Sequence, residues 1–158
     1  MTYCVGILVR DGLVMIADTR TNAGVDNIAT FRKLHLFELP GERIITLATA
    51  GNLSASQSVM SLLADGIEDP ETGEVETLLT APSMFRAAQL VGRAIRRVYA
   101  LDGAEMEKRS MSFDVTMLLG GQIGGPGGLG SGGLGPGGLG PGGLGPGGLG
   151  PMRLYQIY

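Results

Sequence analysis

The chain has 158 residues, of which 44% are hydrophobic and 17% charged, so it is long enough for one soluble globular domain with its own core. Its net charge of −3 argues against a nucleic-acid surface and against a polybasic membrane patch. No apolar run predicts a membrane span or a signal peptide, and the single cysteine, Cys4, is compatible with the reducing, cytoplasmic compartment that we expect.

The first part of the chain predicts strands. Residues 3–10 and 13–17 flank Asp11-Gly12, a typical hairpin turn. Both of these strands are apolar on both faces, so we expect them to be buried, and the second ends at the charged residue Asp18. The remaining segments expected before the first helix are a loop over residues 19–30, strands over 31–38 and 43–50, and a turn at Pro40-Gly41.

Two helices are expected in the middle of the chain. Ser54 and Gln57 form a capping-box pattern, and the apolar residues that follow keep helical spacing as far as Asp65-Gly66. Ser83 is placed to cap a second helix, which we expect to end at Asp102-Gly103. The other features predicted here are a surface connection over residues 68–82 and a solvated basic helix face made of Arg93, Arg96 and Arg97.

Residues 124–151 consist largely of a five-residue Pro-Gly-Gly-Leu-Gly repeat between two expected strands, 112–123 and 152–158. Glycine is entropically costly to order and the few leucines offer little burial, so we expect no packed core in this segment. We interpret it as a tandem expansion in a flexible hairpin loop, with residues 1–123 and 152–158 forming one domain. The alternative is an interaction element with a function of its own.

Thr2 is the residue from which a functional hypothesis starts. If Met1 is removed, Thr2 carries a hydroxyl nucleophile and a free α-amine on one residue. The amine can then take the hydroxyl proton during acyl transfer without a separate histidine. Threonine is common after an initiating methionine, so the alternative is the ordinary start of a strand.

Five segments of the chain carry a resemblance to a known family. They are MTYCV at residues 1–5, DTRTNAGVDNIATFRK at 18–33, AGNL at 50–53, LGGQI at 119–123 and RLYQIY at 153–158. With them the chain resembles a proteasome-type β subunit, and most closely the bacterial Anbu, or ancestral β-subunit, family. The resemblance implies an α+β fold, the four-layer αββα sandwich of N-terminal-nucleophile hydrolases. Such subunits continue well past Tyr158, so we expect only the N-terminal part of that sandwich.

The resemblance also implies roles for seven residues. Thr2 matches the nucleophile, Lys33 the catalytic lysine, and Asp18 the acidic residue that orients this lysine. Gly51 matches the glycine whose amide forms the oxyanion hole. The residues implied to bind substrate are Arg20, which lies beside the site, and Asn22 and Thr49, which hold the substrate backbone and line its first pocket.

The implied function is that of a threonine-type peptidase subunit that hydrolyses amide bonds in peptides or proteins. Its implied partners are like subunits in a ring or spiral homo-oligomer. The alternative is a catalytically inactive structural or assembly subunit, or a truncated fragment of such a protein.

Several of these residues have purely structural interpretations. Asp18 and Lys33 can form a structural ion pair, and Cys4 is expected to be a small buried hydrophobe rather than a thiol nucleophile. His35 lies two residues after Lys33 and is expected at a surface or interface rather than in catalysis. We find neither metal-ligand spacing nor a phosphate-binding loop, so we expect no metal and no cofactor.

Overall fold

The computed structural model describes residues 2–22, 28–70, 72–124 and 150–158. Its strands are β1 (Cys4–Val9), β2 (Gly12–Ala17), β3 (Arg20–Asn22), β4 (Ile28–Thr30), β5 (Leu34–Leu39), β6 (Arg43–Gly51), β7 (Ile67–Glu68), β8 (Val75–Glu76), β9 (Val115–Ile123) and β10 (Arg153–Ile157). Its helices are α1 (Leu53–Asp65), α2 (Met84–Val98), the π-helical segment η1 (Tyr99–Gly103) and α3 (Ala104–Lys108).

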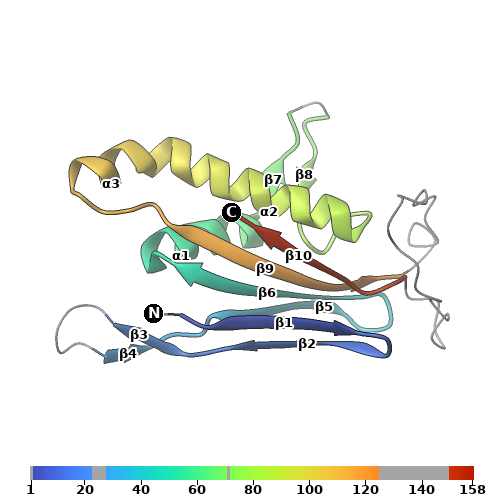
Figure 1. Cartoon of the computed structure of the whole chain (residues 1–158). Helices are drawn as coiled ribbons and strands as arrows, with labels where there is room; N and C mark the ends of the chain where they lie inside the picture. Colours follow the sequence, from blue (N-terminus) through green and yellow to red (C-terminus); the bar gives the residue numbers. More distant parts are fainter. Residues whose placement is uncertain (1, 23–27, 71, 125–149) are drawn as a thin grey trace, which may run out of the picture.

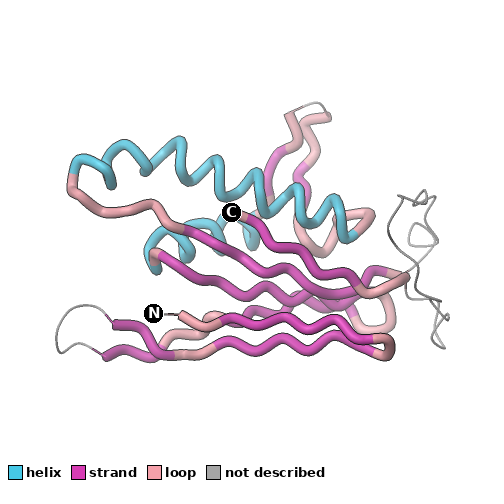
Figure 2. Tube along the Cα trace, viewed as in Figure 1, coloured by secondary structure: helices cyan, strands magenta, loops and turns pink. Residues whose placement is uncertain are grey.

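These elements form three layers (Figures 1 and 2). Strands β10, β9, β6 and β5, in this order, make an antiparallel sheet. Helices α1 and α2 cover one face of this sheet, and the β1–β2 hairpin lies against the other. The chain is therefore a mixture of helices and sheets, as expected. Of the four layers of an αββα sandwich, the described residues contain one helical layer and parts of two sheets.

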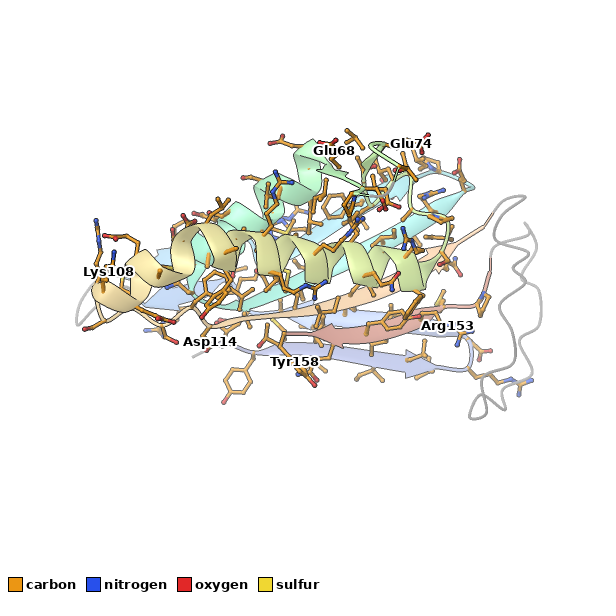
Figure 3. All side chains as sticks on the ribbon, turned by 90° about the horizontal axis from the view of Figure 1, so that it is seen from above. Glu68, Glu74, Lys108, Asp114, Arg153 and Tyr158 are labelled. Carbon is orange, nitrogen blue, oxygen red and sulfur yellow. The ribbon has the colours of Figure 1, made fainter. Side chains whose placement is uncertain are left out.

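The hydrophobic core lies between the helices and the four-stranded sheet. Alternate residues of β6 and β9 point to the helices, and Ile45, Leu47, Met117 and Leu119 are all fully buried. The buried residues that α1 and α2 contribute follow the helical period: Ala55, Val59 and Leu63 in α1, and Ala87, Leu90, Val91, Ala94 and Val98 in α2. Seen from above, α2 runs in roughly the same direction as β10, with Arg153 at the start of β10 and Tyr158 beyond its end (Figure 3).

The β1–β2 hairpin packs on the sheet through one face only. A Cβ added to Gly120 would overlap the side chains of Leu13 and Met15, so glycine allows β2 to lie close against β9. The expectation that both faces are buried is wrong. The hairpin is the outermost layer of the described chain, so its second face remains exposed although it is apolar.

The ends of the helices differ in part from those expected. Helix α1 begins two residues earlier than expected, because Asn52 rather than Ser54 is its N-cap and accepts a hydrogen bond from the Ala55 amide at 3.1 Å. It ends at Asp65, followed by Gly66 with a φ of +90°, as expected. Ser83 caps α2 by accepting from the amide of Arg86 at 3.2 Å, which confirms that prediction.

The second helical segment does not stop at Asp102-Gly103, as had been expected. It continues through η1 into α3, which ends at Lys108. Gly103 is buried, and a Cβ at this position would lie 2.7 Å from the ring of Tyr99, which packs edge-on against Phe113. The glycine therefore serves a close ring contact here instead of ending a helix.

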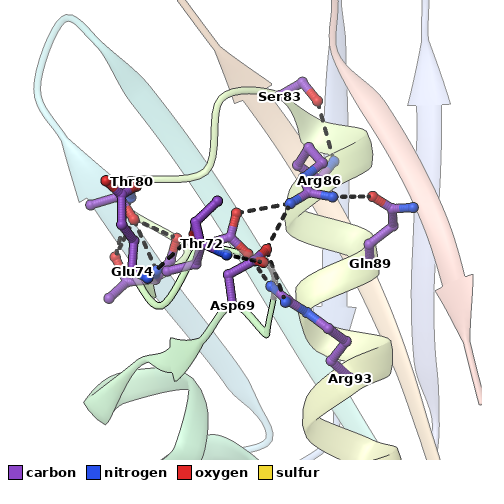
Figure 4. A network of polar contacts seen from close by, with 10 residues as sticks. Asp69, Thr72, Glu74, Thr80, Ser83, Arg86, Gln89 and Arg93 are labelled. Atoms are coloured by element: carbon purple, nitrogen blue, oxygen red, sulfur yellow. Dashed lines mark hydrogen bonds and ion pairs between the residues drawn. The ribbon is translucent and has the colours of Figure 1, made fainter.

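The segment between α1 and α2 is more ordered than a plain surface connection. Strands β7 and β8 pair as a short hairpin, and Asp69 beside it is buried. Asp69 and Glu76 form ion pairs with both Arg86 and Arg93 of α2 (Figure 4). Arg93 therefore belongs to a polar network rather than to a solvated helix face, whereas Arg96 and Arg97 are exposed as expected.

The loop expected over residues 19–30 contains the short pair β3–β4, and residues 23–27 lie outside the described part of the chain. The repeat expected to be a flexible loop, residues 124–151, likewise falls outside it apart from Gly124, Gly150 and Pro151. The predicted pairing of the two flanking strands is confirmed, because β9 and β10 are antiparallel neighbours. No helix in the described ranges is long and apolar enough to cross a membrane.

Candidate active site

The pairing of β1 with β2 brings the start of the chain beside Asp18. The backbone amide of Asp18 donates to the carbonyl of Tyr3 at 3.0 Å, which extends the ladder one step past Cys4 and Ala17. The Tyr3 amide donates in return to Asp18 Oδ1 at 3.0 Å. Thr2 and Asp18 are thus held at the same end of the hairpin by backbone contacts.

Lys33 precedes β5 and reaches this end from the neighbouring sheet. Its Nζ donates to Thr2 Oγ1 at 3.1 Å and lies 3.0 Å from both carboxylate oxygens of Asp18. A further contact of 2.6 Å joins Nζ to the carbonyl oxygen of Arg20. The lysine is only 6% exposed, so nearby acceptors replace the water that its ammonium group lacks.

Asp18 is held as a carboxylate by its surroundings. The backbone amide of Tyr3 is the largest cause of a lowered Asp18 pKa, and the Lys33 ammonium adds to it. The side chain of Asp18 keeps 29% of its exposure, so water still reaches it. Asp18 is therefore a carboxylate at neutral pH, paired with Lys33, and the threonine hydroxyl is the third member of the cluster.

Gly51 lies where β6 turns into α1, at the same end of the molecule as the start of β1 (Figure 1). Its φ of +103° is a conformation that glycine adopts readily, and an added Cβ would overlap the Asp114 carbonyl. The next amide, that of Asn52, donates to this carbonyl at 2.6 Å. Strand-to-helix turns of this kind present backbone N–H groups that can bind an anion.

The three residues expected to bind substrate have different environments. Thr49 is buried, and its amide donates to the Lys33 carbonyl at 2.9 Å, so it supports the backbone of the lysine. The carbonyl oxygen of Arg20 accepts a hydrogen bond from Lys33 Nζ, while the side chain of Arg20 is exposed. Asn22 pairs with Ile28 in the β3–β4 ladder, and its side chain lies outside what the structure describes.

Comparisons with known proteins identify the family to which this chain belongs. No protein-family model and no curated protein matches the chain. Among solved structures, Anbu from Pseudomonas aeruginosa, solved as a helical assembly of the Anbu complex, is 37% identical with a TM-score of 0.73. That match covers 100% of this chain and 53% of the other. The chain belongs to the Anbu family of proteasome-like β subunits.

Two further Anbu structures are similar to this chain. Anbu from Yersinia bercovieri is 38% identical over 100% of this chain and 53% of its own, with a TM-score of 0.68. A Gly-1 mutant of Anbu from Hyphomicrobium sp. strain MC1 is 45% identical over 78% of this chain and 47% of its own, with a TM-score of 0.63. The present chain thus spans about half the length of the Anbu structures that it matches.

Cys4 lies beside the cluster in this Anbu chain. Its Sγ lies 3.5 Å from the carbonyl oxygen of Thr49, to which it can donate. Burial is the largest cause of a raised pKa of this thiol, and the negative charge of Asp18 raises the pKa further. Cys4 is therefore a protonated, half-buried thiol at neutral pH, which is the opposite of an activated nucleophile.

The environment of His35 does not favour a catalytic role, although His35 lies only two residues after Lys33 in the sequence. It lies opposite Leu47 in the β5–β6 ladder and is half-buried. Burial and the nearby Arg32 lower its pKa, so the neutral imidazole is favoured. In the part of the chain that the structure describes, no group of three or more His, Cys, Asp or Glu side chains could hold a metal ion.

Two contributors to the site carry no chemical signal in the sequence. The Tyr3 amide and the Arg20 carbonyl act through the backbone, which any residue type would supply. Asn52 was not predicted as the N-cap of α1, because the capping-box pattern at Ser54 favours a later start of the helix. Asn52 does have a detectable signal: it is an asparagine directly before an apolar helical run, which favours an N-cap.

Proposed function

We propose that this Anbu chain carries the catalytic residues of a threonine-type peptidase, with Thr2 as the nucleophile once Met1 has been removed. The observation that supports this best is the position of Lys33 Nζ, 3.1 Å from Thr2 Oγ1 while Asp18 holds it with both carboxylate oxygens. A purely structural ion pair between Asp18 and Lys33 would not require the Thr2 hydroxyl as a third partner.

In the proposed reaction Thr2 Oγ attacks the carbonyl carbon of a peptide bond, and the α-amine of Thr2 takes the hydroxyl proton. The reference pKa of such an amine is about 7.7–8.0, so a useful fraction is neutral near physiological pH. The Lys33 cation stabilises negative charge on Oγ and disfavours protonation of the amine. The amine then passes its proton to the leaving nitrogen, and water hydrolyses the resulting ester.

The negative oxygen of the tetrahedral intermediate needs donors of its own. We assign the Gly51 amide to this task, because it lies in a strand-to-helix turn with a fixed, glycine-specific backbone. Thr49, Arg20 and Asn22 are assigned to the substrate, which we propose to be a peptide or protein. The Pseudomonas aeruginosa relative was solved as a helical assembly, and we propose a homo-oligomer of like subunits for this chain too.

A test of the nucleophile begins with the intact mass, which reports whether Met1 is removed from the full chain. The rate of hydrolysis of a peptide with a fluorogenic leaving amine is then measured for the unaltered chain, Thr2→Ala and Thr2→Ser. Thr2→Ala is expected to lower the rate by more than about 1,000-fold, while Thr2→Ser keeps part of it. A rate that Thr2→Ala leaves unchanged, with contaminating proteases excluded, would sink this mechanism.

The same measurements decide the alternative of an inactive structural subunit. Its specific support is that Met1 precedes Thr2 in the sequence and blocks the amine that the mechanism needs. Retention of Met1 in the purified chain, together with the absence of hydrolysis in the unaltered protein, would favour that alternative.

A further inference from the structure

Asn52 uses every polar group that it has, and the contacts join two separate segments. Its side-chain Oδ1 accepts from the Ala55 amide at 3.1 Å, and its carbonyl accepts from the Ser56 amide at 3.0 Å, both inside α1. Its side-chain Nδ2 donates to the Ser112 carbonyl at 3.3 Å. Its backbone amide donates to the Asp114 carbonyl at 2.6 Å.

The segment that Asn52 holds lies directly against Gly51. Residues 112–114 lead into β9, whose first residue, Val115, is opposite Gly51 in the ladder. The Asp114 carbonyl that accepts from Asn52 is the group that leaves no room for a Cβ on Gly51. The conformation of the Gly51 turn is therefore set by the distance between α1 and residues 112–114.

Two of the four contacts made by Asn52 fix this distance. The contacts with Ala55 and Ser56 cap a helix, which serine, threonine or aspartate could also do. The side-chain contact with Ser112 is different, because it needs a donor on the capping side chain that reaches across to another segment. Among the residues that cap helices well, asparagine combines this acceptor with an amide donor.

We propose that Asn52 is a positioning residue for the oxyanion-binding amide of Gly51: its side chain caps α1 and at the same time fastens residues 112–114 over the turn. This inference rests on the role proposed above for Gly51. Asn52 acts through the backbone of its neighbour and does not itself touch the reacting atoms. Loss of the Ser112 contact lets the turn relax, so the Gly51 amide is aimed less well at the developing negative charge.

Asn52→Ser tests the positioning role of Asn52. Serine keeps the helix cap and adds no charge, but it has no side-chain amide that could donate to the Ser112 carbonyl. With the full chain and a fluorogenic peptide, kcat is expected to fall about tenfold while KM stays within about twofold, because the oxyanion forms only in the transition state. Affinity for a peptide aldehyde, which gives a tetrahedral adduct on Thr2, is expected to fall by the same factor.

The matched control is Ser83→Ala, which removes the N-cap of α2 far along the chain from Gly51. It is expected to lower Tm without lowering kcat. If Asn52→Ser changes kcat no more than Ser83→Ala does, Asn52 has only a structural role and the inference is overturned.

A second readout does not depend on activity. In protein labelled with ¹⁵N, Asn52→Ser is expected to shift the amide signals of Gly51 and Val115, while that of Gly66, at the other end of α1, stays in place. An unmoved Gly51 signal overturns the inference. Absence of hydrolysis and of aldehyde adduct in the unaltered chain would instead overturn the proposed function, and the Gly51 signal would still decide whether Asn52 positions the turn.

Discussion

At the scale of single residues, the site depends on one buried ammonium group with acceptors at fixed places. Lys33 is held by Asp18, by the Arg20 carbonyl and by Thr2 Oγ1, within distances of 2.6–3.1 Å. A compact ammonium can satisfy all of these acceptors at once, whereas a planar guanidinium places its donors in a wider fork. The identity of the cation, and not its charge alone, therefore matters at this position.

The first prediction follows from this geometry. Lys33→Ala is expected to lower peptide hydrolysis by about 100-fold or more, because no cation then stabilises charge on Thr2 Oγ. Lys33→Arg is expected to restore little of the rate, since the longer, planar group cannot take the same position. The measurement is kcat/KM with circular dichroism as a check on folding. Activity of Lys33→Arg near that of the unaltered chain would contradict the requirement for an ammonium.

The second prediction concerns the acid dependence of folding. The pKa of Asp18 is lowered in the folded chain, so the unfolded chain binds a proton at this residue first as pH falls. The stabilisation by Asp18 is therefore complete above its unfolded pKa of about 3.9 and is lost as pH falls below that value. We expect Tm of the unaltered chain to drop as pH falls below about 3.9.

Asp18→Asn is the matched variant for this pH effect, because its amide has nearly the same shape and no titrating proton. It is expected to be less stable than the unaltered chain at pH 7, where Lys33 loses its counter-charge. The two chains are expected to approach each other in stability in acid, as the carboxylate of the unaltered chain becomes protonated. Equal differences in Tm at both pH values would show that the carboxylate charge contributes nothing.

At the scale of elements, the turn between β6 and α1 concentrates the backbone constraints. Gly51→Ala is expected to lower the free energy of unfolding by about 3 kcal/mol or more, since it adds a side chain at a φ of +103° and against the Asp114 carbonyl. Gly41→Ala is the control. Gly41 has a φ of +77° with open space around it, so only backbone strain of about 1 kcal/mol is expected.

Chemical denaturation of both glycine variants gives their free energies of unfolding. Comparing the two separates the cost of backbone strain from the cost of steric overlap with the Asp114 carbonyl. If Gly51→Ala costs no more than Gly41→Ala, residues 112–114 can move away from the turn, and the tight packing described here does not constrain it. If it costs more, the additional loss measures the steric part of the constraint.

Many of the elements could be predicted from local patterns, because those patterns reflect local causes. The Asp11-Gly12 turn, the Ser83 cap and the end of α1 at Asp65 are each determined by residues within one turn of chain. The pairing of β9 with β10 was also predictable, because two apolar strands flank one connection. The family motifs pointed to Thr2, Asp18 and Lys33, and the structure brings both Thr2 and Asp18 within hydrogen-bonding distance of Lys33 Nζ.

The remaining features depend on neighbours that are distant in sequence. A glycine such as Gly103 usually indicates the end of a helix. Here it makes room for the ring of Tyr99, and the helical segment continues past it. The spacing of Arg93 in the sequence is typical of a solvated helix face. Its ion pairs with Asp69 and Glu76 form only because the β7–β8 hairpin folds back toward α2. The backbone contacts around Lys33 could not be predicted either, because any residue type supplies an amide or a carbonyl.

At the scale of the whole molecule, the outer face of the β1–β2 hairpin is the feature that stands apart. Val5 lies opposite Ile16 and Ile7 lies opposite Val14, so four large apolar side chains are neighbours on one surface. Each is exposed by 46–59%. Scattered apolar residues are normal on a protein surface, but a contiguous group on a two-stranded sheet favours contact with another apolar surface.

The last prediction tests that surface, here defined as Val5, Ile7, Val14 and Ile16. In the described chain this face has no covering layer, so we expect the purified protein to bind an apolar dye such as anilinonaphthalene sulfonate and to self-associate as its concentration rises. The double variant Ile7→Thr with Val14→Thr is expected to reduce both effects. Threonine keeps the β-branched shape that suits a strand, so the hairpin itself should persist.

Val75→Thr is the control for this change, because Val75 is 60% exposed on β8, outside that surface. It is expected to leave dye binding and sedimentation unaltered. The Lys33 cluster lies at the opposite end of the hairpin strands from the turn at Asp11-Gly12, and both substitutions point away from the sheet, so peptide hydrolysis should survive in the double variant. Unchanged dye binding and sedimentation in the double variant would show that the β1–β2 surface is not what drives association.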